Sequence, residues 1–166
     1  MSHDAWGRVL RFSPMTLDAA RVIADTWKYP EPYNFYDATA DAEDYQDYQE
    51  LITPSMWPDS FWQVRHEGEL VGFFTADATE DGEACEISLG LRPDLTGGGR
   101  GSAFLTAGLK QLHRSEMPDR LVLSVAAFNI RAISAYEGAG FENIERYVQR
   151  TNGGVHDFVR MELRSR

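Results

Sequence analysis

The chain has 166 residues, of which 43% are apolar and 12% aromatic, and its formal net charge at pH 7 is −10. This length and composition predict one globular domain over residues 1–166. Lysine occurs only at Lys28 and Lys110, and so acidic a chain disfavours nucleic acid as a partner because a polyanion would be repelled. No apolar run is long enough to predict a membrane span or a signal peptide, so we expect a cytoplasmic protein with no membrane partner.

Cysteine and histidine usage predicts neither a disulfide nor a metal site. Cys85 is the only cysteine, and the four histidines lack the spacing of metal ligands. Acidic residues are concentrated in positions 29–64, a segment without Lys, Arg or His. Such a segment would attract a cationic partner, but acids that only keep a surface soluble are the alternative interpretation.

The first half of the chain predicts a strand, two helices and a hairpin. Residues 9–12 are expected to form a short strand, and helical spacing of apolar residues over 17–27 predicts a helix with Thr16 as its N-cap. Two prolines and many aromatic residues break regular structure over 29–36, and residues 42–52 could form a second, acidic helix. The runs 60–66 and 70–76 flank a Glu-Gly-Glu turn, which predicts a β-hairpin.

The second half alternates strands with helices. A strand over 84–91 precedes a glycine-rich turn and a helix that includes Phe104–Leu112, and the apolar run 121–128 predicts a central strand. Asn129 should cap a helix that Gly140 ends. Strands over 141–150 and 156–163, joined by a turn at 152–154, complete a mixed α+β sheet with helices on both faces.

The glycine-rich turn Thr96-Gly-Gly-Gly-Arg-Gly-Ser102 opens a helix after a strand. Bare backbone N–H groups at a helix N-terminus attract anionic oxygens, so a phosphate site is indicated. A Walker-type loop is disfavoured because no Lys precedes Ser102. A dinucleotide fold is disfavoured because the loop lies in the middle of the chain and the next strand does not end in an acid. A pyrophosphate loop for an acyl-CoA and a turn used only for packing remain.

Two sequence blocks resemble the GNAT superfamily of N-acetyltransferases. The first runs from Pro93 through Thr96-Gly-Gly-Gly-Arg-Gly101 and resembles the family's Gln/Arg-x-x-Gly-x-Gly/Ala loop, with Thr96 departing at its first position. The second, Asn129-Ile-Arg-Ala-Ile-Ser-Ala-Tyr136-Glu-Gly-Ala-Gly-Phe141, resembles the family's N-x-x-A-x-x-x-Y-x-x-x-G-F block. The resemblance spans about residues 9–163 and is least informative over 29–60.

The resemblance implies a mixed, mostly antiparallel twisted sheet of about seven strands, in which the fourth and fifth strands splay apart to admit the pantetheine arm of acetyl-CoA. The main chain of Leu89, Gly90 and Leu91 would then hold this arm, and one N–H would face the thioester oxygen as an oxyanion donor. The implied cofactor-binding residues are these three together with Thr96, Gly97, Gly98, Gly99, Arg100, Gly101, Ser102, Asn129 and Arg131.

Tyr136 and Glu86 are the expected catalytic residues for direct attack of an amine in a ternary complex. Tyr136 lies two helical turns after Asn129, on the same helix face, and would protonate the departing thiolate. Glu86 alternates away from Cys85 on its strand and would be the base, although a structural ion pair with an arginine is the alternative. Cys85 itself is expected to pack in the core.

The acceptor is expected to be a primary amine of a small molecule or peptide, bound by Trp27, Tyr33, Phe35 and Tyr36. Aromatic faces attract ammonium groups, but these side chains could equally form a hydrophobic lid or the contact of a homodimer. Two other functions stay open: a non-catalytic domain that binds CoA as a sensor, and a nucleotide-binding oxidoreductase.

Overall fold

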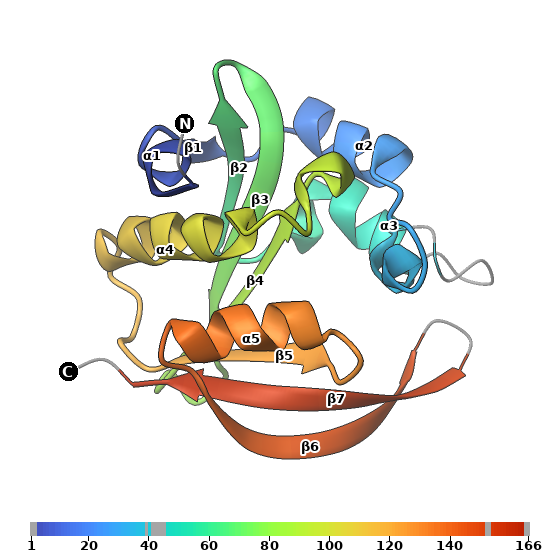
Figure 1. The fold of residues 1–166 in the computed structure, drawn as a ribbon, viewed down its shortest axis with the longest axis vertical. Coiled ribbons are helices and arrows are strands. Elements are labelled where there is room, and N and C mark those ends of the chain that lie inside the picture. The colour runs from blue at the N-terminus through green and yellow to red at the C-terminus, as the bar shows by residue number, and fades with distance from the viewer. Residues whose placement is uncertain (1–2, 39, 41–45, 152–153, 165–166) are drawn as a thin grey trace.

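The computed structural model describes residues 3–38, 40, 46–151 and 154–164, and in this part of the chain seven strands form one twisted sheet (Figure 1). The strand order is β1-β2-β3-β4-β5-β7-β6, and every neighbouring pair is antiparallel except β4 and β5. The strands are β1 (Arg11–Pro14), β2 (Ser60–His66), β3 (Glu69–Ala78), β4 (Cys85–Leu91), β5 (Leu121–Ala126), β6 (Glu142–Thr151) and β7 (Gly154–Leu163). The predicted mixed, mostly antiparallel sheet is confirmed.

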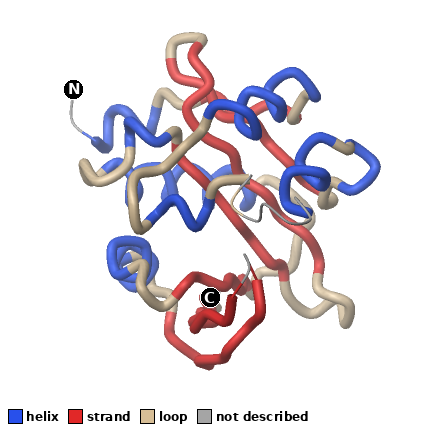
Figure 2. Tube along the Cα trace, turned by 90° about the vertical axis from the view of Figure 1, so that its right-hand side faces the viewer, coloured by secondary structure: helices blue, strands red, loops and turns tan. Residues whose placement is uncertain are grey.

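Helices cover both faces of this sheet, which Figure 2 shows between them. The described α-helices are α1 (His3–Arg8), α2 (Leu17–Thr26), α3 (Gln46–Ile52), α4 (Arg100–His113) and α5 (Ile130–Gly138), and the short 3₁₀ helices are η1 (Tyr33–Tyr36), η2 (Pro54–Met56) and η3 (Pro93–Leu95). Helices α1, α4 and α5 pack on one face, and α2, α3 and η2 on the other. Among the described residues, no helix is long and apolar enough to span a bilayer.

Side chains of β4 alternate between these two layers, as the sequence predicted. Cys85, Ile87 and Leu91 are buried on the face covered by α4, whereas Glu86 and Ser88 are exposed on the other face. Burial also raises the pKa of the Cys85 thiol. Cys85 is therefore a packing residue, as expected.

The predicted helix caps are both present. The Thr16 hydroxyl accepts a hydrogen bond from the Ala19 N–H at 3.2 Å, and Asn129 Oδ1 accepts one from the Ala132 N–H at 3.1 Å. Each cap satisfies a backbone donor in the first turn of its helix, which fixes where α2 and α5 begin. Gly140, with φ of 103°, follows α5 in the left-handed conformation that ends helices.

Several boundaries differ from the sequence prediction, two of them for a clear reason. The first strand begins at Arg11 rather than residue 9 because residues 3–8 form α1, whose Gly7 lies close to the backbone of Ala103 on α4. The central strand ends at Ala126 because the Asn129 N–H donates to the Ala126 carbonyl at 2.9 Å and turns the chain into α5. Parts of the predicted acidic helix (41–45) and of the last turn (152–153) lie outside the described residues.

The parallel strands β4 and β5 diverge after a short contact. Cys85 pairs with Leu121 and Glu86 with Val122, and no further pairs follow in this described part of the sheet. Figure 1 shows β4 turning away from β5 beyond this point. The splayed fourth and fifth strands are therefore confirmed, and residues 87–91 present an edge to the gap.

Candidate active site

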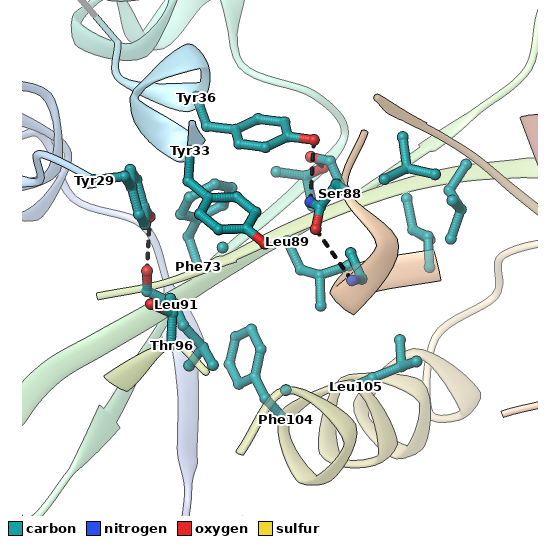
Figure 3. Close-up of a pocket in the computed structure, with 18 of the residues that line it drawn as sticks. Tyr29, Tyr33, Tyr36, Phe73, Ser88, Leu89, Leu91, Thr96, Phe104 and Leu105 are labelled. Carbon is teal, nitrogen blue, oxygen red and sulfur yellow. Dashed lines mark hydrogen bonds between the residues drawn. The ribbon is translucent and has the colours of Figure 1, made fainter. Parts of the chain in front are cut away.

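A cavity of about 860 Å³ opens between the diverging ends of β4 and β5 (Figure 3). Its first end is formed by these two strands, the glycine-rich loop 96–99 and the first turns of α4 and α5, and its second end by α2, η1, α3, η2, β2 and β3. The predicted site residues that line it are Leu89, Gly90, Leu91, Thr96, Gly97, Gly99, Gly101, Ser102, Asn129, Arg131, Tyr136, Trp27, Tyr33 and Tyr36.

Main-chain hydrogen bonds show which residues of β4 face the gap. The Cys85 N–H donates to the Arg120 carbonyl beside β5, and the Arg92 N–H donates to the Val71 carbonyl on β3, both at 2.8 Å. Main-chain groups of a strand alternate between its two edges, and β4 pairs with β3 without a register shift. The N–H and C=O groups of Leu89 and Leu91 therefore point into the gap.

The two ends of this β4 edge differ in whether their main-chain groups already have a hydrogen-bond partner. The Tyr29 hydroxyl donates to the Leu91 carbonyl at 2.6 Å (Figure 3), and burial raises the pKa of Tyr29, so this donor stays protonated at neutral pH. Leu89 keeps an N–H and a carbonyl toward the gap, where no described residue of β5 pairs with them. Leu89 is thus the residue best placed to donate to a thioester oxygen.

Gly90 contributes space to the cavity, and its main-chain groups are not available to hydrogen-bond a ligand there. The same alternation directs its N–H and C=O toward β3, so its predicted main-chain contact with the cofactor is not supported. A Cβ on Gly90 would lie 2.4 Å from Cε2 of Phe73, the residue paired with it on β3. The missing side chain therefore lets the Phe73 ring lie over β4 beside Leu89.

The glycine-rich loop presents backbone donors to the cavity. Gly97 and Gly99 have φ of 81° and 84°, which side chains disfavour, and Gly99 is the N-cap of α4. The next three residues, 100–102, begin the helix, and their N–H groups have no intrahelical partner. The helix dipole adds to these donors, so the loop suits an anionic group.

Two arginines lie against this loop. A Cβ on Gly97 would lie 3.0 Å from Nη1 of Arg131, and a Cβ on Gly98 would lie 3.1 Å from Nη1 of Arg100. The Arg131 guanidinium also lies 4.0 Å from the centre of the Tyr33 ring. Backbone donors flanked by two guanidinium groups fit a diphosphate, although Gly98 and Arg100 are not among the described lining residues of the cavity.

Thr96, a predicted cofactor-binding residue, uses both of its donors within its own turn. Its hydroxyl donates to the Pro93 carbonyl at 2.8 Å, and its N–H donates to the same oxygen at 3.3 Å. Both donors therefore hold the η3 turn together. Thr96 lines the cavity, but we expect it to shape the loop rather than bind phosphate.

Tyr136 reaches the cavity from the last turn of α5. Its ring packs against Phe141 at 5.8 Å between centroids and against the main hydrophobic core. Burial, followed by the proximity of Tyr36, raises the pKa of Tyr136. The hydroxyl is therefore protonated at neutral pH, the state that a proton donor requires.

Glu86 lies on the same face of β4 as Ser88 but is not among the described residues that line the cavity. Its carboxylate pairs with Arg160 at 3.3 Å, and Glu86 lies opposite Asp77 of β3 on the neighbouring strand. The pKa of Asp77 is raised, chiefly by desolvation and also by the nearby charges of Asp59 and Glu86. The ion pair that the sequence left as an alternative is thus present, and the assignment of Glu86 as base stays a prediction.

Tyr33 and Tyr36 point into the cavity from η1, whereas Phe35 does not line it (Figure 3). Side chains three residues apart in a 3₁₀ helix eclipse one another, so the two tyrosines share one face and Phe35 lies on another. The Phe35 ring packs instead against Phe128 and His156, at 5.7 and 4.8 Å between centroids. Its predicted role in acceptor binding is therefore not supported.

Comparison with known proteins decides the family. The sequence pattern of the acetyltransferase (GNAT) family matches residues 21–141, well over half of the chain. The chain is a member of the GNAT family.

Mycothiol acetyltransferases of two Streptomyces species resemble part of this GNAT chain. The protein of Streptomyces avermitilis is 38% identical over 89 residues, and that of Streptomyces coelicolor is 38% identical over 85 residues. These matches cover 53% and 51% of the chain but only 29% and 27% of the relatives. The chain thus matches less than a third of the length of these relatives.

Solved structures extend the similarity of fold across more than nine-tenths of this GNAT chain. Spermidine N-acetyltransferase from Vibrio cholerae, in complex with CoA and spermine, superposes with a TM-score of 0.70, 18% identity and coverage of 94% of this chain and 95% of that one. AAC(6')-Ib in complex with ribostamycin and coenzyme A superposes with a TM-score of 0.67, 18% identity and coverage of 91% and 92%. At these identities the likeness shows the shared fold.

Several residues at the second end of the cavity were not predicted as site residues. They include Asp47, Glu50, Trp57, Phe61 and Phe73. Alternation within the predicted hairpin could have placed Phe61 and Phe73 on one face. Trp57 had no comparable signal, because its position depends on its packing against α2 and its hydrogen bond to α3. In the described residues, no three His, Cys, Asp or Glu side chains gather as metal ligands would.

Proposed function

We propose that the chain is an acetyl-CoA-dependent N-acetyltransferase that transfers the acetyl group to a primary amine by direct attack in a ternary complex. One observation carries the proposal: a single cavity is lined by the glycine-rich loop, the unpaired edge of β4 at Leu89 and Tyr136. The acetyltransferase names of the relatives support acetyl transfer, and the neighbouring spermidine N-acetyltransferase, solved with CoA and spermine, supports an amine acceptor.

The loop and the strand edge suit different parts of acetyl-CoA. The diphosphate would bind the N–H groups of residues 97–102 between Arg100 and Arg131. The pantetheine arm would lie along the β4 edge, with its amides paired to the Leu89 carbonyl and the Leu91 N–H. The thioester carbonyl would then face the Leu89 N–H, and a donor at this position typically contributes about 10²- to 10³-fold to the rate.

Transfer forms a C–N bond and breaks the C–S bond. The neutral amine attacks the thioester carbon, the Leu89 N–H stabilises the oxyanion, and collapse of this intermediate expels the CoA thiolate. Tyr136 gives its proton to the thiolate sulfur, a step that is uphill by about 2 kcal/mol at the ordinary pKa values of a tyrosine and a thiol. Burial raises the pKa of Tyr136, so the step costs more than this unless thioester binding lowers that pKa. Glu86 would accept the amine proton through water, since its carboxylate lies two residues from Ser88 on the same face.

Two measurements test the proposal in order. Calorimetry should detect acetyl-CoA binding in preference to NAD and ATP, and thiol release should then occur with at least one member of a panel of primary amines. Acetyl-CoA binding without thiol release for any amine, amino acid or peptide would favour a non-catalytic CoA-binding domain. Binding of NAD alone would contradict the cofactor assignment.

A further inference from the structure

The second end of the cavity is walled by a continuous group of aromatic rings: Trp27, Trp57, Phe61 and Phe73. The Trp57 and Phe61 ring centroids lie 5.3 Å apart, those of Phe61 and Phe73 6.2 Å, and those of Trp27 and Phe73 6.4 Å. Edge-to-face and tilted contacts of this kind leave ring faces and edges available to a further ring. We call these four residues the aromatic wall.

The aromatic wall is held in place before any ligand arrives. The Trp57 indole N–H donates to the Leu51 carbonyl at 2.9 Å, and Trp27 is only 4% exposed. The rings pack on a core that includes Met15 and Ile23 beneath α2. Because the rings are already fixed, a ligand that packs against them loses little affinity to the ordering of side chains.

Phe73 brings the aromatic wall next to the reacting centre. Its ring lies over Gly90, where a Cβ would come within 2.4 Å of it, and Gly90 is the direct neighbour of Leu89. Phe61 lies opposite Thr75 on the adjacent strand, on the same face of the sheet. An amine at the Leu89 N–H that carries a ring on a short chain would therefore place this ring against Phe73 and Phe61.

Charge at this end of the cavity is limited. Of the described lining residues there, only Asp47 and Glu50 are charged, and both belong to α3. Asp37, another acid of the 29–64 segment, instead accepts a hydrogen bond from the Tyr29 N–H at 2.9 Å. The acids on α3 can attract one ammonium, and desolvation by the apolar wall opposes the retention of its charge because burial lowers the pKa of an amine.

We propose that the acceptor is an arylalkylamine, a primary amine on a short aliphatic chain that ends in an aromatic ring. The inference rests on the proposed function and specifies its substrate class. The ring packs in the aromatic wall, and the nitrogen lies beside Leu89. A polyamine or an aminoglycoside would bring several ammonium or hydroxyl groups against apolar rings that cannot satisfy them.

A panel of five amines tests this class. With acetyl-CoA saturating, thiol release should give kcat/KM values at least about tenfold higher for 2-phenylethylamine and tryptamine than for n-butylamine, putrescine and spermidine. Equal values for n-butylamine, or a preference for either polyamine, would overturn the inference and leave the proposed function standing. Failure of every amine to release thiol would instead count against the proposed function.

Variants separate the aromatic wall from general effects on folding. Phe73→Leu and Phe61→Leu should each lower the kcat/KM ratio of 2-phenylethylamine to n-butylamine roughly tenfold. Trp62→Leu is the matched control, since Trp62 packs on Phe74 at 6.1 Å and is not among the described lining residues. Each ratio is measured on one preparation, so a partly unfolded fraction cancels. An unchanged ratio in both wall variants would contradict the proposal.

Discussion

Asn129 Nδ2 donates a hydrogen bond to the Tyr36 hydroxyl at 3.1 Å, which links η1 to the start of α5 (Figure 3). Tyr29 links the same segment to β4, because its hydroxyl donates to the Leu91 carbonyl. The segment 29–36 therefore bridges the gap between β4 and β5 at both sides. Since Asn129 is also a predicted cofactor residue, a pantetheine arm bound there would have to share this amide with Tyr36 or displace it.

Loss of the Tyr136 hydroxyl should affect chemistry and not cofactor binding. Tyr136→Phe keeps the ring that packs on Phe141 but removes the proton donor, so kcat should fall at least about tenfold. The dissociation constant of acetyl-CoA, measured by calorimetry, should stay nearly constant. An unaltered turnover number would remove Tyr136 from the mechanism.

Gly101→Ala should raise stability and weaken acetyl-CoA binding at the same time. A Cβ at Gly101 meets no atom within 4 Å, so alanine should stabilise α4 by roughly 0.5–1 kcal/mol. Gly101 lines the cavity, however, and the added methyl group would occupy the space of a phosphate oxygen. The free energy of unfolding, measured with denaturant, should therefore rise, whereas the affinity for acetyl-CoA, measured by calorimetry, should fall.

The control for this change is Gly138→Ala. Gly138 is also a helical residue with open space around it, but it lies at the end of α5 and outside the described cavity lining. This variant should gain similar stability and bind acetyl-CoA as the unmodified protein does. Equal affinities in the two glycine variants would argue against a phosphate at Gly101.

Arg131→Gln should weaken binding only of cofactors that carry the diphosphate. Arg131 lies at the glycine loop and over Tyr33, so its loss should raise the KM for acetyl-CoA roughly tenfold and reduce the dependence of binding on salt. S-acetylpantetheine lacks the diphosphate and should react at the same rate with both proteins. A parallel loss with this truncated thioester would instead assign Arg131 to the reaction centre.

The sequence predicted most strands and the glycine loop because these features are local or periodic, whereas the splayed strands were implied only by the resemblance to the GNAT superfamily. Caps at Thr16 and Asn129 followed from single side chains whose hydrogen bonds are made within one helical turn. Helix α1 was missed because six residues carry too little periodicity, and it is held by packing on α4.

The acceptor end was predicted less well because it depends on contacts between distant elements. Phe35 belonged to the right segment, but only the 3₁₀ geometry of η1 shows that it turns away from the cavity. The role of Gly90 depended on the ring of Phe73 across the ladder. The Thr96 donors, likewise, are used by Pro93 in a turn that composition does not reveal.

Glu86→Gln tests the predicted base. If Glu86 accepts the amine proton, this variant should lower kcat/KM and remove the acidic limb of its pH profile. Asp157→Asn is the control, because it breaks a comparable surface pair, with Arg146 at 2.7 Å, and Asp157 is not among the described lining residues. Identical pH profiles for both variants and the unmodified protein would leave Glu86 with the ion pair to Arg160 alone.

The raised pKa values of Tyr29 and Tyr136 predict a loss of stability in alkaline solution. Burial is the main cause of both shifts, so the folded protein holds these protons above pH 10, where tyrosines of the unfolded chain ionise. Above about pH 10 the unfolded state therefore binds fewer protons, and the free energy of unfolding should fall by about 1.4 kcal/mol per pH unit for each tyrosine. Urea unfolding at pH 8, 10 and 11 measures this slope. Tyr29→Phe and Tyr136→Phe should each make the fall in the free energy of unfolding above pH 10 less steep. Below pH 10 the dependence on pH should be the same in all three proteins, because their remaining titrating groups are the same. Slopes that coincide in all three would show that neither hydroxyl holds its proton longer in the folded state.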